Sequence, residues 1–204
     1  MKKKIYNSAL NNVKNENQAG TCAYYAHAKY SIMTCDIVTD DLHRDYIDCD
    51  VLYTEAPFPD GFSYFNDKAE VKDQRTYDDL AKAIEGIIEL QIPSYIISGK
   101  TMLKKITTDD NIRPIYLSGR GCSAFLSVFN TSDCNVASNP DIPTKSTESL
   151  ISSLANNYNS LGDFMCGYGQ NVIDFMEAGG KRFVASDHDS RAVGFLKKRL
   201  EDFI

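Results

Sequence analysis

The amino-acid sequence predicts an α/β protein whose mostly parallel sheet is covered by helices on both faces. Short apolar runs alternate with helix-like segments along most of the chain, and two of the runs are close enough to form one antiparallel hairpin. The 204 residues, 43% hydrophobic and 25% charged, fit a single globular domain over 1–204. The chain can therefore bury a substantial core without disulfides or metal.

Seven apolar runs of β-type composition predict seven strands. The fourth and fifth runs are separated by a turn at Gly119-Arg-Gly-Cys122, which predicts the hairpin. The expected strands are Ser31–Asp36, Asp50–Thr54, Ser94–Ser98, Pro114–Ser118, Ala124–Phe129, Gly162–Met165 and Arg182–Ser186.

Four segments repeat apolar residues at the helical period, and they separate most of these strands. In the last of them Ala192, Val193, Leu196 and Leu200 share one face. The expected helices are Tyr77–Leu90, Ser149–Tyr158, Val172–Met176 and Ser190–Phe203. Gly179-Gly180 is a plausible stop for the third.

Charge and cysteine usage narrow the function classes. The net charge of −6 disfavours a protein that binds nucleic acid only through its phosphate backbone. A local basic face would nevertheless be enough for nucleic-acid binding. The six cysteines form no Cys-x-x-Cys pair, so we expect no metal site. No apolar run reaches about 18 residues and no signal-peptide pattern is present, so we expect a cytoplasmic protein without membrane contact.

The most informative segment is a glycine-containing loop after the sixth apolar run. Gly167 and Gly169 follow the run directly, and a helix-like segment begins behind them. Such glycines let the backbone approach a ligand, and a helix start supplies free N–H groups. The seventh run ends at Asp187, whose carboxylate can accept hydrogen bonds from both hydroxyls of a ribose. The pattern predicts a nucleoside-containing ligand.

The segment Asp163-Phe-Met-Cys-Gly-Tyr-Gly169 resembles the cofactor motif of S-adenosylmethionine-dependent DNA amino-methyltransferases, often Asp-Pro-Phe-x-Gly-Ser-Gly. The segment 179–189 resembles that family's second cofactor strand. The resemblance implies a Rossmann-like methyltransferase fold, S-adenosylmethionine as cofactor, and a ribose held by Asp187. It also implies that Asp163 or Phe164 lies beside the methionine part. The residues that it places at the cofactor in this loop are Asp163, Phe164, Cys166, Gly167 and Gly169.

The order of the motifs resembles one circularly permuted branch of that family, in which the catalytic motif precedes the cofactor motif. The run that ends at Asp36 resembles the strand whose terminal Asp lies by the cofactor adenine. The segment Pro143–Leu150 resembles the one that helps hold the methionine tail, which implies a cofactor contact for Thr144 and Lys145. This order extends along nearly the whole chain.

The segment Glu55-Ala56-Pro57-Phe58 resembles the family's catalytic motif, in which Asp, Asn or Ser precedes Pro-Pro and an aromatic. The resemblance implies that the acidic side chain and a backbone carbonyl accept hydrogen bonds from the target amine, while the aromatic stacks on the flipped base. Glu55 and Ala56 depart from the motif, and an extra methylene moves a carboxylate by about 1 Å or more. Either the substrate sits differently or the loop is impaired.

Three hypotheses about the acceptor follow. The first is the exocyclic amine of a DNA base, adenine rather than cytosine, read with little sequence specificity because no separate target-recognition domain fits in the chain. The second is an RNA, nucleotide or protein acceptor. The third is a cofactor-binding protein without transferase activity. Phe62, Tyr64 and Phe65 either cover a planar substrate or form a hydrophobic lid.

Overall fold

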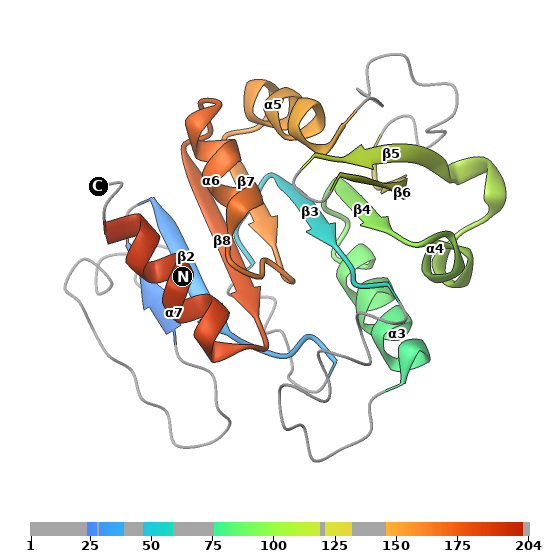
Figure 1. Cartoon of the computed structure of the whole chain (residues 1–204), viewed down its shortest axis with the longest axis horizontal. Coiled ribbons are helices and arrows are strands. Elements are labelled where there is room, and N and C mark those ends of the chain that lie inside the picture. The colour runs from blue at the N-terminus through green and yellow to red at the C-terminus, as the bar shows by residue number, and fades with distance from the viewer. Residues whose placement is uncertain are drawn as a thin grey trace.

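The computed structural model contains one eight-stranded sheet with helices on both faces (Figure 1). The strand order is β1-β2-β8-β7-β3-β4-β6-β5, so strands from the two ends of the chain meet in the middle of the sheet. The structure describes residues 24–27, 29–38, 47–58, 76–118, 121–131 and 146–201.

Five neighbouring strands, β2, β8, β7, β3 and β4, run parallel to one another, which gives the sheet its mostly parallel character. Strand β6 runs against both β4 and β5 and forms the predicted hairpin with β5, while β1 runs against β2. The strands are β1 Tyr24–Ala26, β2 Tyr30–Thr34, β3 Val51–Glu55, β4 Ser94–Ser98, β5 Arg113–Leu117, β6 Cys122–Phe129, β7 Ser160–Asp163 and β8 Arg182–Asp187.

All seven predicted strands are present, and the predicted fold class is confirmed. The sheet has one strand more than predicted, because the three-residue β1 pairs with the edge strand β2. The short helix α4, Lys100–Ile106, was also not predicted. Its seven residues bury only Met102 and Leu103, too few for a recognisable helical period.

The longer helices begin where their sequences offer caps. Thr76 starts α3, Tyr77–Ile88, and Ser146 starts α5, Thr147–Asn157, each through a reciprocal capping box. Helix α6, Gln170–Glu177, begins instead after Gly169, and α7 spans Ser190–Glu201. Among the described residues, none of the helices combines the length and apolarity that crossing a membrane requires.

Alternate residues of the central strands point to opposite faces of the sheet, where the buried side chains form three clusters. Tyr53 and Ile97 point into the core shared with α5, α6 and α7. Ile96 points to the opposite face, where it packs with Leu80 of α3 and Met102 of α4. The helices therefore cover both faces, and α7 lies against β2 and β8 at the end of the sheet away from α3 and α4 (Figure 1).

The close approach of β7 to its neighbours requires glycine at position 162. A Cβ there would lie 2.6 Å from Leu52 Cδ2 and 2.8 Å from Cys49 Sγ. We expect Gly162→Ala to lower the free energy of unfolding by about 1–3 kcal/mol, measured by urea denaturation. The matched variant Gly86→Ala, in an open position of α3, should raise it by roughly 0.5–1 kcal/mol. Equal effects of the two substitutions would contradict the packing described here.

Candidate active site

A cavity of about 630 Å³ lies at the carboxyl ends of four neighbouring parallel strands. Asp36 follows β2, Asp187 ends β8, Phe164 follows β7 and Glu55 ends β3, and all four residues line the cavity. Strands β7 and β3 are neighbours in the sheet. From β7 the chain continues to β8 on one side, and from β3 it continues to β4 on the other side, so the strand order reverses between β7 and β3. A cavity at such a reversal of strand order is where open α/β sheets bind ligands, and its volume suits a ligand of drug size.

The glycine loop and the acidic strand end meet in this cavity. The Gly167 N–H donates to Asp187 Oδ2 at 2.8 Å, and both residues line the cavity. Gly167 and Gly169 have φ angles of 51° and 77°, in the left-handed region that favours glycine. Gly169 forms the N-cap of α6, where its Cα lies against Leu196 of α7 without room for a Cβ. The two glycines thus form a tight turn. Gly167 lines the cavity, whereas Gly169, predicted at the cofactor, is packed against α7 and is not part of the cavity wall.

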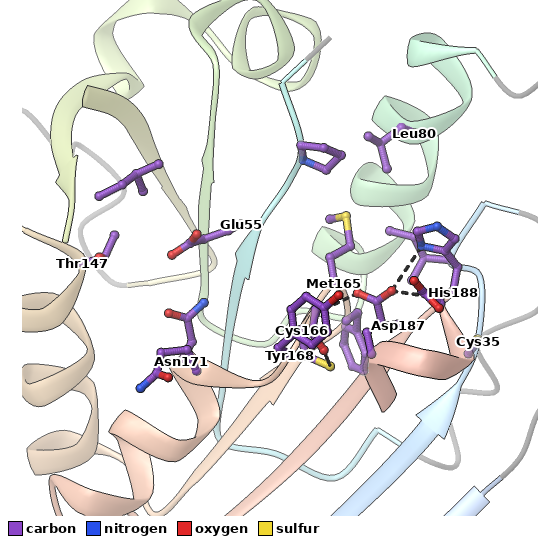
Figure 2. A pocket seen from close by; sticks show the side chains of 18 of the residues that line it. Cys35, Glu55, Leu80, Thr147, Met165, Cys166, Tyr168, Asn171, Asp187 and His188 are labelled. Carbon is purple, nitrogen blue, oxygen red and sulfur yellow. Dashed lines mark hydrogen bonds and ion pairs between the residues drawn. The ribbon is translucent and has the colours of Figure 1, made fainter. Parts of the chain in front are cut away.

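Asp187 is held in one orientation by its neighbours. Its second oxygen, Oδ1, accepts the Asp189 N–H at 2.9 Å and lies 3.3 Å from His188 Nδ1. The residue is buried, with 8% of its surface exposed, and it lines the cavity. Each carboxylate oxygen has two lone pairs, so Asp187 retains acceptor capacity after these contacts. Figure 2 shows Asp187 and His188 side by side at one end of the cavity.

The other motif residues of the loop divide into two groups. Phe164 and Cys166 line the cavity, whereas the side chain of Asp163 is fully buried beneath it. Asp163 Oδ1 accepts from the Thr54 hydroxyl at 3.1 Å and from the Met165 N–H at 3.2 Å. Burial, with the nearby Asp163 and Asp187 charges, raises the pKa of the Cys166 thiol well above its usual value. Cys166 is therefore a neutral wall residue rather than a nucleophile.

Burial raises the pKa of Asp163 to about 8, and the charges of Glu55 and Asp187 add to the effect. Between about pH 4 and pH 8 the unfolded chain ionises this carboxyl while the folded chain keeps it protonated. The free energy of unfolding therefore falls as the pH rises through this range, by up to about 1.4 kcal/mol per pH unit. We expect Asp163→Asn to flatten this decline in urea unfolding at pH 5, 6, 7 and 8. The same slope in wild type and variant would refute it, and Asp78→Asn, at an exposed carboxylate, is the control.

Glu55 lies at the end of β3 and points into the cavity (Figure 2). Its Oε1 accepts a hydrogen bond from the phenol of Tyr53 at 2.7 Å. Tyr53 is fully buried, and burial followed by the charge and hydrogen bond of Glu55 raises its pKa well above the usual value. The contact was not predicted from the sequence, although residues two apart on a strand share a face.

The rest of the predicted catalytic motif is held by β4 and α3. The Ala56 N–H donates to the Ile97 carbonyl at 2.8 Å, and the Ala56 carbonyl accepts from the Ser98 hydroxyl at 3.0 Å. Pro57 lines the cavity and its carbonyl accepts from the Tyr77 hydroxyl at 3.1 Å. The Phe58 ring instead lies against Gly99, and it is not among the described residues of the cavity wall.

The opposite wall of the cavity comes from the first turns of α5 and α6, which the sequence indicated only in part. Thr147 and Asn171 both face the cavity, as Figure 2 shows. The Ser118 N–H donates to Thr147 Oγ1 at 3.2 Å, which joins the end of β5 to α5. The first turn of α6, which has no side-chain cap, therefore offers N–H groups that favour an anionic group. In α5 the N–H groups of Glu148 and Ser149 are already bonded to the hydroxyls of Ser118 and Ser146.

Asp36 was predicted to lie by an adenine, and the structure places it on the cavity wall beyond β2. Its Oδ1 accepts the Val38 N–H at 3.1 Å, which fixes the turn through Ile37. Thr144 and Lys145, predicted at the methionine tail, and the aromatic residues 62, 64 and 65 lie outside the described residues.

No protein-family model matches the chain, and no curated protein matches it by sequence. Comparison of the structure finds M1.HpyAVI, with a TM-score of 0.53 and 11% identity over 84% of this chain and 98% of that protein. The chain shares its fold with M1.HpyAVI. The complex of M1.HpyAVI with SAM gives a TM-score of 0.51 and 12% identity over the same shares of the two chains.

A third structure is TTHA0409 of Thermus thermophilus, named as a DNA modification methylase and solved with S-adenosyl-L-methionine. Its TM-score is 0.48 at 11% identity, over 74% of this chain and 85% of that one. The two M1.HpyAVI comparisons show that the sheet and helices described above form a Rossmann-like fold found in methyltransferases.

Proposed function

We propose that this protein binds S-adenosylmethionine in the cavity and transfers its methyl group to an exocyclic amine of a DNA base, adenine rather than cytosine. The observation that carries the proposal is that Gly167, Asp187 and Glu55 line one cavity, with Gly167 bonded to Asp187. Solved DNA methyltransferases share the fold, and M1.HpyAVI has been crystallised with the cofactor.

The residues of the cavity fit the parts of the cofactor. Asp187 would accept hydrogen bonds from the ribose hydroxyls, with Asp36 beside the adenine and Phe164 beside the methionine part. The uncapped first turn of α6 would offer N–H groups to the methionine carboxylate. Asp36, Glu55, Asp174 and Asp187 also line the cavity, and their negative charge suits a ligand with a sulfonium and an ammonium group.

When bound, S-adenosylmethionine supplies an electrophilic methyl group. Glu55 would accept a hydrogen bond from the acceptor amine and orient the nitrogen lone pair toward that methyl group. The Ala56 carbonyl would be a second acceptor, because a carbonyl oxygen retains one lone pair after the hydrogen bond from Ser98. The buried packing of Ala56 against β4 keeps this carbonyl fixed.

We also infer that the chain is a circularly permuted methyltransferase in a single domain. Strand β3 with Glu55 precedes the cofactor loop by more than a hundred residues, yet it pairs directly with β7. The carboxyl ends of both strands therefore lie at one cavity, although the predicted catalytic motif precedes the cofactor motif in the chain.

The replacement of Asp-Pro by Glu55-Ala56 favours two other candidates: an RNA, nucleotide or protein acceptor, and a cofactor-binding protein without transferase activity. Calorimetric titration with S-adenosylmethionine tests all of them together, because each requires binding. Transfer of a labelled methyl group to DNA, RNA and protein then separates them. Labelling of DNA at adenine N6 supports the proposal. Tight binding with no labelling of any acceptor contradicts it and supports the binding protein.

A further inference from the structure

Tyr53 is a buried polar residue to which the proposed function assigns no role. It is the largest fully buried side chain of the central sheet, and it lies within the core formed with α5, α6 and α7. A phenol buried without a hydrogen-bond partner costs free energy, so its O–H requires an acceptor. That acceptor is Glu55 Oε1, at 2.7 Å.

The phenol keeps its proton at every pH at which the site would operate. Its pKa is raised well above the ordinary value by burial, by the charge and hydrogen bond of Glu55, and by the charges of Asp163 on β7 and Asp174 on α6. All three neighbouring carboxyl groups disfavour a phenolate. Tyr53 is therefore a constant hydrogen-bond donor that cannot itself take up a proton from a substrate.

The hydrogen bond also restricts the position of Glu55. Glutamate has one more rotatable bond than aspartate, so a hydrogen bond to its carboxylate excludes a larger set of side-chain positions. A short hydrogen bond to a charged acceptor is stronger than a neutral one, and Tyr53 itself cannot move within its packed core. The carboxylate is thus tied to a rigid strand at the point where β3 meets the cavity.

We propose that Tyr53 is the positioning residue for Glu55: its buried phenol holds one carboxylate oxygen, so that a glutamate serves where a shorter acid would otherwise be needed. This inference rests on the proposed function, because it assigns Glu55 to the acceptor amine. Tyr53 touches neither cofactor nor acceptor and acts only through Glu55.

The test is a double-mutant cycle with Tyr53→Phe, Glu55→Gln and the double variant, each assayed for methyl transfer. In the wild-type background Tyr53→Phe should lower kcat roughly tenfold or more, the loss expected for a hydrogen bond to a charged group. S-adenosylmethionine affinity by calorimetry should stay unchanged. In the Glu55→Gln background the same substitution should cost clearly less, because the amide oxygen accepts only a weaker, neutral hydrogen bond from the phenol.

Tyr95→Phe is the matched control. Tyr95 is a second buried tyrosine, on the adjacent strand β4 in the same core, and its hydroxyl contacts Tyr158 rather than Glu55. Its substitution should leave kcat unchanged. A loss of kcat in Tyr53→Phe that is equally large in the Glu55→Gln background would indicate a purely structural role and overturn the proposal.

Unfolding free energies of the same four proteins provide a readout that needs no activity. A non-additive change between positions 53 and 55 supports the hydrogen bond, and additive changes contradict it. If the wild type methylates no acceptor, the proposed function fails while this coupling still reports on the Tyr53–Glu55 contact. The two failures are therefore distinguishable.

Discussion

Replacing Asp187 with alanine is expected to weaken S-adenosylmethionine binding by about a hundredfold or more, since two hydrogen bonds from the ribose to a charged group are lost. The same substitution removes the acceptor of the Gly167 N–H at 2.8 Å and of the Asp189 N–H at 2.9 Å, which together hold the loop against the strand end. Calorimetric titration of the purified variant measures the change directly.

Two further variants make this result specific. Asp187→Asn keeps one acceptor oxygen and most of the shape, so it should bind more weakly than wild type and more tightly than Asp187→Ala. Asp109→Ala removes an exposed carboxylate that pairs with Lys100 and Lys104 and is not part of the cavity wall. It should bind like wild type. An Asp187→Ala protein that melts like wild type and binds the cofactor equally well would exclude the proposed ribose site.

Replacing Glu55 with glutamine is expected to lower kcat for methyl transfer by roughly 10²–10³, the loss expected when a group that stabilises the transition state is removed. The amide keeps an acceptor oxygen but loses the charge that stabilises the developing positive charge on the amine. Cofactor affinity should change little, because Glu55 would face the methyl group rather than the adenosine.

The measurement is a single-turnover assay with labelled cofactor, which separates chemistry from product release. Glu85→Gln is the matched control, because Glu85 is an exposed glutamate on α3 that is not part of the cavity wall. It should retain nearly full activity. Full activity of Glu55→Gln would remove this residue from the reaction and leave the acceptor site unassigned.

Much of the fold could be predicted because its signals are local. The β-type runs and the helical periods predicted seven strands and four of the helices, with bounds shifted by up to about two residues from those observed. Strand β1 was not predicted, because three residues are too few to show an alternation of apolar and polar side chains. Helix α4 was not predicted, because it buries only two side chains.

The residues of the site could be predicted only where they lie in one continuous segment of the chain. Gly167 and Asp187 belong to consecutive parts of one β-α-β unit, so their spacing along the chain indicated their meeting. The wall formed by Thr147 and Asn171 joins two helices that no local pattern connects. The partner of Tyr53 depends on the depth at which β3 is buried, which the residues of the strand alone do not specify.

A crystal structure of the protein with S-adenosylmethionine bound would test the central proposal most directly. We expect both ribose hydroxyls within hydrogen-bond distance of the Asp187 carboxylate, the methionine part beside Gly167, and the methyl group facing Glu55. A cofactor bound elsewhere, or a cavity that stays empty at saturating concentration, would contradict the account.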